Sequence, residues 1–396
     1  MSVDSTADVR PAQPATRAHL WEVDIVRIVT FLCVIGVHTV SHTVSATDLP
    51  LYLLLGILHF TRNVFFALTA FVLIYSYNNK PVPMRKFWPR RFLLVGVPYV
   101  VWSVIYYTAN TLHTGTHKSL PELGLALLID ILTGVAWYHL YFLLVTMQVY
   151  LLMPVIVWLI RKTRGHHARL LVIVGIVQLA IVAIYFYFPK LVHWAHGYTT
   201  EVFISYIFFI IAGAVAADHQ ASFLTWVRAH RPRIGIIVAV TGAVTLGVFL
   251  LAIHLGDSYN TAGLPLQPVM MAWGTAVALG LLAIGTYWAD HRRPGGRGTW
   301  FVARASDRSF GIFLSHPLFI WLAVGIGSDW LTSVVAKPWL TLVVYIGVIV
   351  CAVALTELVR KTPLSLALTG RPWERKQRSD VPPPAVAAVP TESAAH

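Results

Sequence analysis

The sequence predicts an all-α integral membrane protein with about ten transmembrane helices. Charged residues make up 12% of the 396 residues, where about 25% is usual in a soluble domain, and 57% are hydrophobic. The mean hydropathy is +0.68. Lipid can cover this many apolar side chains, but the interior of a globule of this length cannot. The apolar runs are continuous, as in 170–188 and 234–254, and lack the alternation of a membrane β-barrel, so helices are expected.

Each predicted span is an apolar run close to the roughly 20 residues that cross a bilayer. The predicted spans are 24–44, 56–77, 91–110, 138–160, 169–188, 201–217, 233–254, 267–289, 308–327 and 338–360. The apolar stretch 123–135 is too short to span, and it predicts a re-entrant or interfacial helix. Residues 20–370 therefore form the predicted membrane domain, and 1–19 and 371–396 are predicted to be disordered cytoplasmic tails.

The distribution of cationic residues predicts the orientation. With the N-terminus in the cytoplasm, 25 of the 30 lysines and arginines fall in cytoplasmic segments, and only Lys118, Lys190 and Lys337 fall in outer loops. This bias repeats from loop to loop, as the positive-inside rule requires, so both termini are predicted to be cytoplasmic. The same bias explains the net charge of +13 without a nucleic-acid partner.

A polar pair inside the first span is the sharpest functional signal. His38 follows Arg27 by eleven positions, which places both on one helix face about 16 Å apart along the axis. Asp24 precedes Arg27 by one turn on that face. The guanidinium can hold a phosphate or polarise a carbonyl, and the imidazole can take a proton from an alcohol. The structural alternative is that Arg27 snorkels to the headgroups and His38 bonds a neighbouring helix.

A second signal is the cationic start of the third span. Arg85, Lys86, Arg90 and Arg91 would suit a polyphosphate ligand, because arginine matches phosphate geometry. The positive-inside rule and contact with anionic lipid would explain the same cluster without a ligand.

Weaker candidates lie in three other spans. His316 is expected about 12 Å in from the cytoplasmic end of the ninth span, where a Ser/His pair beside a proline kink is the structural alternative. Arg62 lies within the second span, and Tyr138 opens the fourth, where it could also be an interfacial anchor. The sequence contains neither a Gly-rich phosphate loop followed by Lys-Ser/Thr nor an HExxH motif, which excludes P-loop ATPases and that type of zinc protease.

Taken together, these segments resemble the acyltransferase-3 family of membrane acyltransferases. The likeness rests on Trp21 to Arg27 followed by ten residues and His38, on 61–71, 86–99, 137–154, 309–317 and 362–370. It covers about residues 20–370, and the order and spacing of the pieces carry it. The common Ser-Gly of the second helix is Thr69-Ala70 here.

The resemblance implies transfer of an acyl group, usually acetyl, from cytoplasmic acyl-CoA. The acceptor would be a hydroxyl of a glycan, a lipid-linked sugar or a small molecule, and the location would be the inner (plasma) membrane. His38 would be the base that activates the acceptor hydroxyl. Arg27 would support His38 or bind the donor, and Asp24 would orient Arg27.

The resemblance also assigns the remaining candidates. Arg85, Lys86, Arg90 and Arg91 would hold the phosphates of acetyl-CoA or another acyl-CoA, and Arg62, Tyr138 and His316 would bind the acceptor. No metal is expected, because the thioester supplies the driving force.

Two other functions remain open at this point. A multi-span transporter or flippase for a glycan or metabolite would also have about ten helices with buried Arg and His. Such carriers often show inverted repeats and matching broken helices, and neither is visible in this sequence. A receptor or scaffold would leave Arg27 and His38 unexplained.

Overall fold

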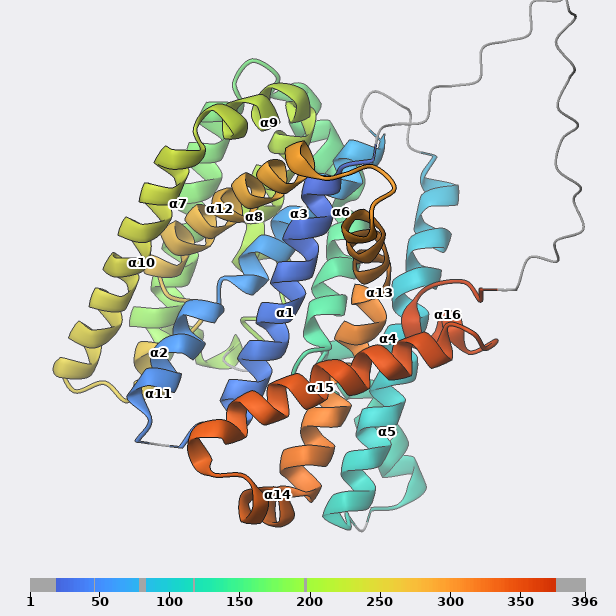
Figure 1. The fold of residues 1–396 in the computed structure, drawn as a ribbon. Coiled ribbons are helices and arrows are strands. Elements are labelled where there is room, and N and C mark those ends of the chain that lie inside the picture. The colour runs from blue at the N-terminus through green and yellow to red at the C-terminus, as the bar shows by residue number, and fades with distance from the viewer. Residues whose placement is uncertain (1–18, 46, 78–82, 117, 196–197, 375–396) are drawn as a thin grey trace, which may run out of the picture.

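A computed structural model of the chain describes residues 19–45, 47–77, 83–116, 118–195 and 198–374 (Figure 1). Within these ranges the regular structure is entirely helical, which confirms the predicted all-α class. The described ranges contain nine helices long and apolar enough to cross a membrane, or ten if one bent pair counts as a span. The prediction of about ten spans is therefore confirmed.

The α-helices follow one another along the chain, with short 3-10 and π segments between some of them. They are α1 (Trp21–Thr43), α2 (Leu49–Leu58), α3 (Thr61–Tyr77), α4 (Met84–Thr114), α5 (Leu120–Thr133), α6 (Tyr141–Lys162), α7 (His167–Tyr187), η1 (Pro189–Ala195), η2 (Phe203–Tyr206), α8 (Ile207–Asp218), α9 (Gln220–Ala229), α10 (Arg231–His254), α11 (Tyr259–Ala262), α12 (Val269–His291), α13 (Arg297–Ile320), η3 (Trp321–Ile326), α14 (Ser328–Val334), α15 (Lys337–Val359) and α16 (Ser365–Thr369).

Three spans begin well before their predicted starts, and the third, α4, starts at Met84. The second starts at Leu49, because Asp48 accepts a hydrogen bond from the Leu51 amide and caps α2, so α2 and α3 together form one long apolar segment. The ninth starts at Arg297. The charged side chains in its first turns form ion pairs with neighbouring helices. For example, Arg304 Nη2 lies 2.6 Å from Oε2 of Glu357 on α15.

The sixth predicted span, 201–217, is not one continuous α-helix. Its first part is the 3-10 segment η2, and α8 starts only at Ile207. Side-chain amides of neighbouring helices explain the late start. Gln148 of α6 accepts a hydrogen bond from the Phe203 amide, and Gln178 of α7 accepts one from the Phe208 amide, so these donors are satisfied without a helical turn before them. At its other end, α8 bends by 97° into α9.

The short helix α5 matches the predicted apolar stretch 123–135 closely. It has 14 residues and begins at a capping box between Ser119 and Glu122. None of its side chains is buried, although the Tyr99 hydroxyl of α4 donates a hydrogen bond to the Ile131 carbonyl. It is too short to be a span, and an exposed apolar helix of this length fits an interfacial position.

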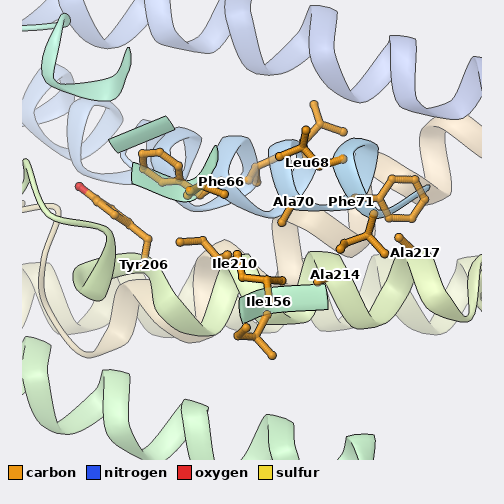
Figure 2. Close-up of a cluster of buried hydrophobic side chains, with 14 of the residues drawn as sticks. Phe66, Leu68, Ala70, Phe71, Ile156, Tyr206, Ile210, Ala214 and Ala217 are labelled. Carbon is orange, nitrogen blue, oxygen red and sulfur yellow. The ribbon is translucent and has the colours of Figure 1, made fainter. Parts of the chain in front are cut away.

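The centre of the bundle is the packing of α3 against α8. Figure 2 shows Phe66 and Phe71 of α3 opposite Ile210 and Ala214 of α8. Gly213 brings the two backbones together: a Cβ atom there would lie 2.0 Å from the Ala67 carbonyl oxygen. Small residues at such crossings are typical of membrane helices.

Ion pairs connect α13 and the end of α15 to the segment after α16. Arg308 and Arg360, both buried, bind Glu374 at 2.8 Å. Burial would raise the pKa of Glu374, but the hydrogen bonds and charges of the two arginines outweigh it and lower that pKa. Residues 371–374 are therefore packed onto the bundle, and the rest of the predicted tails, 1–18 and 375–396, lies outside the described residues.

Candidate functional site

The site is organised along α1, which lies inside the bundle and contacts α2, α3, α12, α13 and α15. Arg27 lies near its first turns, on the cation-rich side. The Arg27 guanidinium donates to Ser306 Oγ of α13 at 2.8 Å, and the Ser306 hydroxyl donates to Asp24 Oδ1 at 2.6 Å. The direct Arg27–Asp24 separation is 3.5 Å, and Asp24 also bonds His19. Asp24 thus holds Arg27 mainly through Ser306, which sequence reasoning did not single out.

Arg27 lines a cavity of about 230 Å³ that also contains Arg91 and Arg371. We call it the cationic cavity. Arg91 is half-buried, with its guanidinium 5.8 Å from the Phe87 ring centre and 5.9 Å from that of Tyr150. The remaining lining is Phe31, Phe65, Leu68, Thr69, Val72, Leu73, Leu94, Val95, Phe142, Leu143, Thr146, Tyr150, Ser306, Ser309, Phe310 and Gly370.

The predicted cationic cluster of α4 is divided by the fold. Arg91 lines the cationic cavity, whereas Arg85, Lys86 and Arg90 are exposed and are not part of its lining. Arg371, which the sequence analysis placed in a disordered tail, lies across the cavity just after α16. A dianionic or polyanionic group in this cavity would therefore face Arg27, Arg91 and Arg371.

His38 lines a second, smaller pocket of about 30 Å³, which we call the histidine pocket. Arg62 and His139 line it too, and the Arg62 guanidinium lies 5.6 Å from the Tyr141 ring centre. The structure thus brings Arg62 of α3 next to His38 of α1. The remaining lining is Val34, Val37, Thr61, Phe65, Tyr141, Phe142 and Phe313.

Aromatic side chains separate the two spaces. Phe65 and Phe142 line both the cationic cavity and the histidine pocket. Their ring centres are 5.2 Å apart. The Phe31 ring centre lies 4.5 Å from that of Phe65, and the Phe313 ring centre lies 5.5 Å from that of Phe142. We call these four residues the phenylalanine layer. It comes from α1, α3, α6 and α13, so no local sequence pattern could reveal it.

Tyr138 and His316 lie against His38. The His38 ring centre is 4.7 Å from that of Tyr138 and 5.4 Å from that of His316, onto which it stacks. The His316 ring donates from Nδ1 to the Phe313 carbonyl at 2.7 Å, so its Nε2 is the accepting nitrogen. The His139 ring centre lies 5.6 Å from that of His316.

This group contains buried polar ring nitrogens of His139 and His316. Among the described residues, none bonds Nε2 of His316 or either ring nitrogen of His139. Both rings are at most 1% exposed. Because an unbonded buried polar atom is costly, such atoms call for a ligand or another functional explanation. The Trp137-Tyr138-His139 sequence hinted at this, but only the fold places His139 beside His316.

A cavity of about 630 Å³ lies elsewhere, between α1, α3, α7, α8, α9 and α12. Its lining is apolar except for His219, Ser222 and Thr275. It contains none of the predicted site residues, so its size alone does not make it the reaction site.

The fold and the two adjoining spaces define a multi-pass membrane enzyme with a cationic cavity next to a histidine pocket. The model of the acyltransferase-3 family, described as an acyltransferase domain, matches residues 20–357. The chain belongs to this family and is a membrane acyltransferase. Comparisons with curated proteins and with solved structures give no match.

Proposed function

We propose that the protein transfers an acyl group from acyl-CoA to an acceptor hydroxyl, with His38 as general base. The observation that carries the proposal is the arrangement along α1: Arg27 lines the cationic cavity, His38 lines the histidine pocket, and only Phe65 and Phe142 are shared between them. A donor with phosphates at one end and a thioester at the other suits this arrangement.

The donor would bind from the cation-rich side, which the positive-inside rule assigns to the cytoplasm. Arg91 and Arg371 would hold phosphate at the cationic cavity, and Arg27, held by Ser306 and Asp24, would fix the donor closer to the reacting carbonyl. The exposed Arg85, Lys86 and Arg90 would contribute a weaker, solvent-screened attraction.

The reaction then needs two proton transfers and one displacement. His38 takes the proton from the acceptor hydroxyl, and the oxygen attacks the thioester carbonyl carbon. The negative charge on the carbonyl oxygen of the tetrahedral intermediate faces the guanidinium of Arg62 in the same pocket. Collapse breaks the carbon–sulfur bond, and the leaving CoA thiolate takes this proton from the His38 imidazolium. The thioester supplies the driving force, and no metal is required.

The acceptor would occupy the far side of His38. Tyr138 and His316 flank the base, and the unbonded nitrogens of His139 and His316 offer hydrogen bonds to hydroxyl groups. A glycan, a lipid-linked sugar or a small hydroxylated molecule in the inner membrane would satisfy them. The binding of such a polar ligand offsets the cost of burying these rings.

The phenylalanine layer must move during the reaction. The histidine pocket has room for only about two water molecules, so a thioester reaches His38 only when the rings of Phe65 and Phe142 rotate. The closed layer keeps water from the cationic cavity away from His38 until the donor is bound.

Donor binding is the first test. The purified protein is heated in detergent with acetyl-CoA, CoA or ATP, because a ligand of the folded state raises the unfolding temperature by mass action. Stabilisation by acetyl-CoA and CoA, but not by ATP, supports the donor site. The absence of any shift at millimolar ligand contradicts it.

The base is tested by His38→Ala, with His42→Ala as the matched control. His42 is one turn further along α1 and is exposed. We expect His38→Ala to bind acetyl-CoA normally but to lose acyl transfer by about 100-fold or more, and His42→Ala to keep most of its activity. Full activity of His38→Ala would refute the mechanism.

A further inference from the structure

Three potential metal-ligating side chains meet on the cation-rich side of the bundle, away from the acyl-transfer site. His167 is the first residue of α7, Asp218 is the last residue of α8, and His219 lies at the 97° bend between α8 and α9. One ligand atom from each lies within 4.8 Å of the others. His167 Nδ1 and His219 Nε2 are 2.8 Å apart. None of these residues lines the cationic cavity or the histidine pocket.

The surroundings of His167 fix which nitrogen it presents. Its ring is buried, and its Nε2 lies 2.9 Å from the Ile160 carbonyl oxygen at the end of α6. A carbonyl only accepts, so Nε2 carries the hydrogen and the lone pair of Nδ1 points to His219. A histidine ligand whose second nitrogen donates to a carbonyl is the usual arrangement around protein-bound metals, because it sets the tautomer and the ring orientation.

We propose that His167, Asp218 and His219 bind a zinc ion. Two imidazole nitrogens and one carboxylate oxygen form a ligand set that zinc accepts, with water completing the coordination, whereas Mg²⁺ and Ca²⁺ prefer oxygen ligands alone. Tetrahedral ligands about 2.0–2.1 Å from zinc are about 3.4 Å from one another. The present separations, from 2.8 Å up to at most 4.8 Å, bracket that value, so small side-chain rotations suffice.

Binding of the ion replaces a hydrogen bond by two metal–nitrogen bonds. In the metal-free pair, His219 donates its Nε2 hydrogen to His167 Nδ1. When zinc takes both nitrogens, His219 carries its hydrogen on Nδ1 instead, and both rings stay neutral. No oxidant, reductant or other reactant is needed.

Arg164 competes with the cation for Asp218. Its Nη2 lies 2.8 Å from Asp218 Oδ1, whereas its Nε is 3.4 Å from Oδ2. The hydrogen bond and charge of Asp218 raise the pKa of Arg164, which therefore stays cationic. Arg161 lines a small cavity beside the same carboxylate. Oδ2, the less tightly held oxygen, is the one that would turn to zinc, and the nearby positive charge would weaken the affinity.

The site would fasten two turns of the chain to each other. His167 starts α7 directly after the α6–α7 turn, and His219 lies at the α8–α9 bend. The His167–His219 hydrogen bond and the Arg164–Asp218 ion pair already join the two regions, and the ion would add a third link. His219 also lines the apolar cavity of about 630 Å³. A bound ion would therefore hold one wall of that cavity in place.

The test uses the full chain, purified without a histidine tag and stripped with chelator. Titration with Co²⁺, as a spectroscopic substitute for Zn²⁺, is expected to give the visible absorption of a cobalt–nitrogen site, and Zn²⁺ is expected to raise the unfolding temperature where Mg²⁺ and Ca²⁺ do not. His219→Ala should weaken binding by about 10-fold or more. His166→Ala, an exposed histidine next to the site, should leave it unchanged.

The Arg164→Ala variant distinguishes a metal site from a purely structural hydrogen bond between His167 and His219. Removal of the competing cation should tighten Zn²⁺ binding, an outcome that a structural role for the two histidines would not produce. No cobalt spectrum and no zinc stabilisation, or equal zinc stabilisation in wild type and His219→Ala, would overturn the proposal. If His219→Ala does not fold, the direction of the Arg164→Ala change decides.

Discussion

Replacement of Ser306 by alanine tests how Arg27 is held. The Ser306 hydroxyl accepts from Arg27 at 2.8 Å and donates to Asp24 at 2.6 Å, and Ser306 is 4% exposed. The variant loses two hydrogen bonds to charged groups, each contributing about 1.5–3 kcal/mol. Arg27 can then close its 3.5 Å gap to Asp24 and regain one such bond. The net loss in the free energy of unfolding is therefore about 1.5–3 kcal/mol.

The same change should weaken donor binding. An Arg27 guanidinium drawn onto Asp24 is displaced and more fully neutralised, so it offers less to a donor in the cationic cavity. We expect the Kd for acetyl-CoA to rise about 10-fold, equivalent to about 1.4 kcal/mol. In thermal unfolding, the loss of stability corresponds to a decrease of about 2–4 °C.

Ser309→Ala is the matched control. Ser309 lies one turn along α13 and lines the same cavity, but its hydroxyl donates only to the Ser306 carbonyl of its own helix at 2.7 Å. Its loss should change stability and donor affinity little. Equal effects of the two substitutions would refute the bridging role of Ser306. A less stable Ser306→Ala protein with unchanged donor affinity would instead remove Arg27 from donor binding.

Three further predictions follow from the packing and the charges. Arg91→Ala should raise the Kd for acetyl-CoA at least 10-fold, measured by ligand-dependent unfolding. Replacement of the exposed Arg90 by alanine should change this Kd less than 3-fold. A larger effect of Arg90→Ala than of Arg91→Ala would contradict the assignment of the cationic cavity to the donor. Gly213→Val should lower the free energy of unfolding by about 3 kcal/mol or prevent folding, because even a Cβ atom there would lie 2.0 Å from a backbone oxygen. The control, Gly247→Val on α10, should be tolerated, because the space around Gly247 is open. Glu357→Gln should lower the unfolding free energy by about 1–3 kcal/mol, because it removes the charge that two arginines of α13 share; unchanged stability would make that pairing unimportant.

Much of the architecture was predictable because it depends on composition and local periodicity. Continuous apolar runs require lipid, and the alternation of cationic loops predicts the number of spans. The predicted re-entrant or interfacial helix at 123–135 appears as α5 because its apolar residues and turn signals are local. The divided sixth span was not predictable, since its late start depends on the side-chain amides of Gln148 and Gln178, contributed by α6 and α7.

The candidate site divides in the same way. Arg27 and His38 could be paired from the sequence because both lie on α1, where the helical repeat sets their relative direction. The sequence could not show which cation of the α4 cluster would line the cavity, because all four satisfy the positive-inside rule equally. Only the packing of Arg91 against Phe87 and Tyr150 distinguishes it from the others.

The sequence by itself determined that this chain is embedded in a membrane as a helical bundle, that its cations gather on one side, and that α1 bears a charge and an imidazole on one face. Only the tertiary structure decided that Ser306 joins Arg27 to Asp24, that four phenylalanines separate the cationic cavity from the histidine pocket, and that His316 stacks on His38. The physical reason is one of range. Hydropathy and helical periodicity act over a few residues, whereas these contacts join side chains up to 282 positions apart and depend on how whole helices pack.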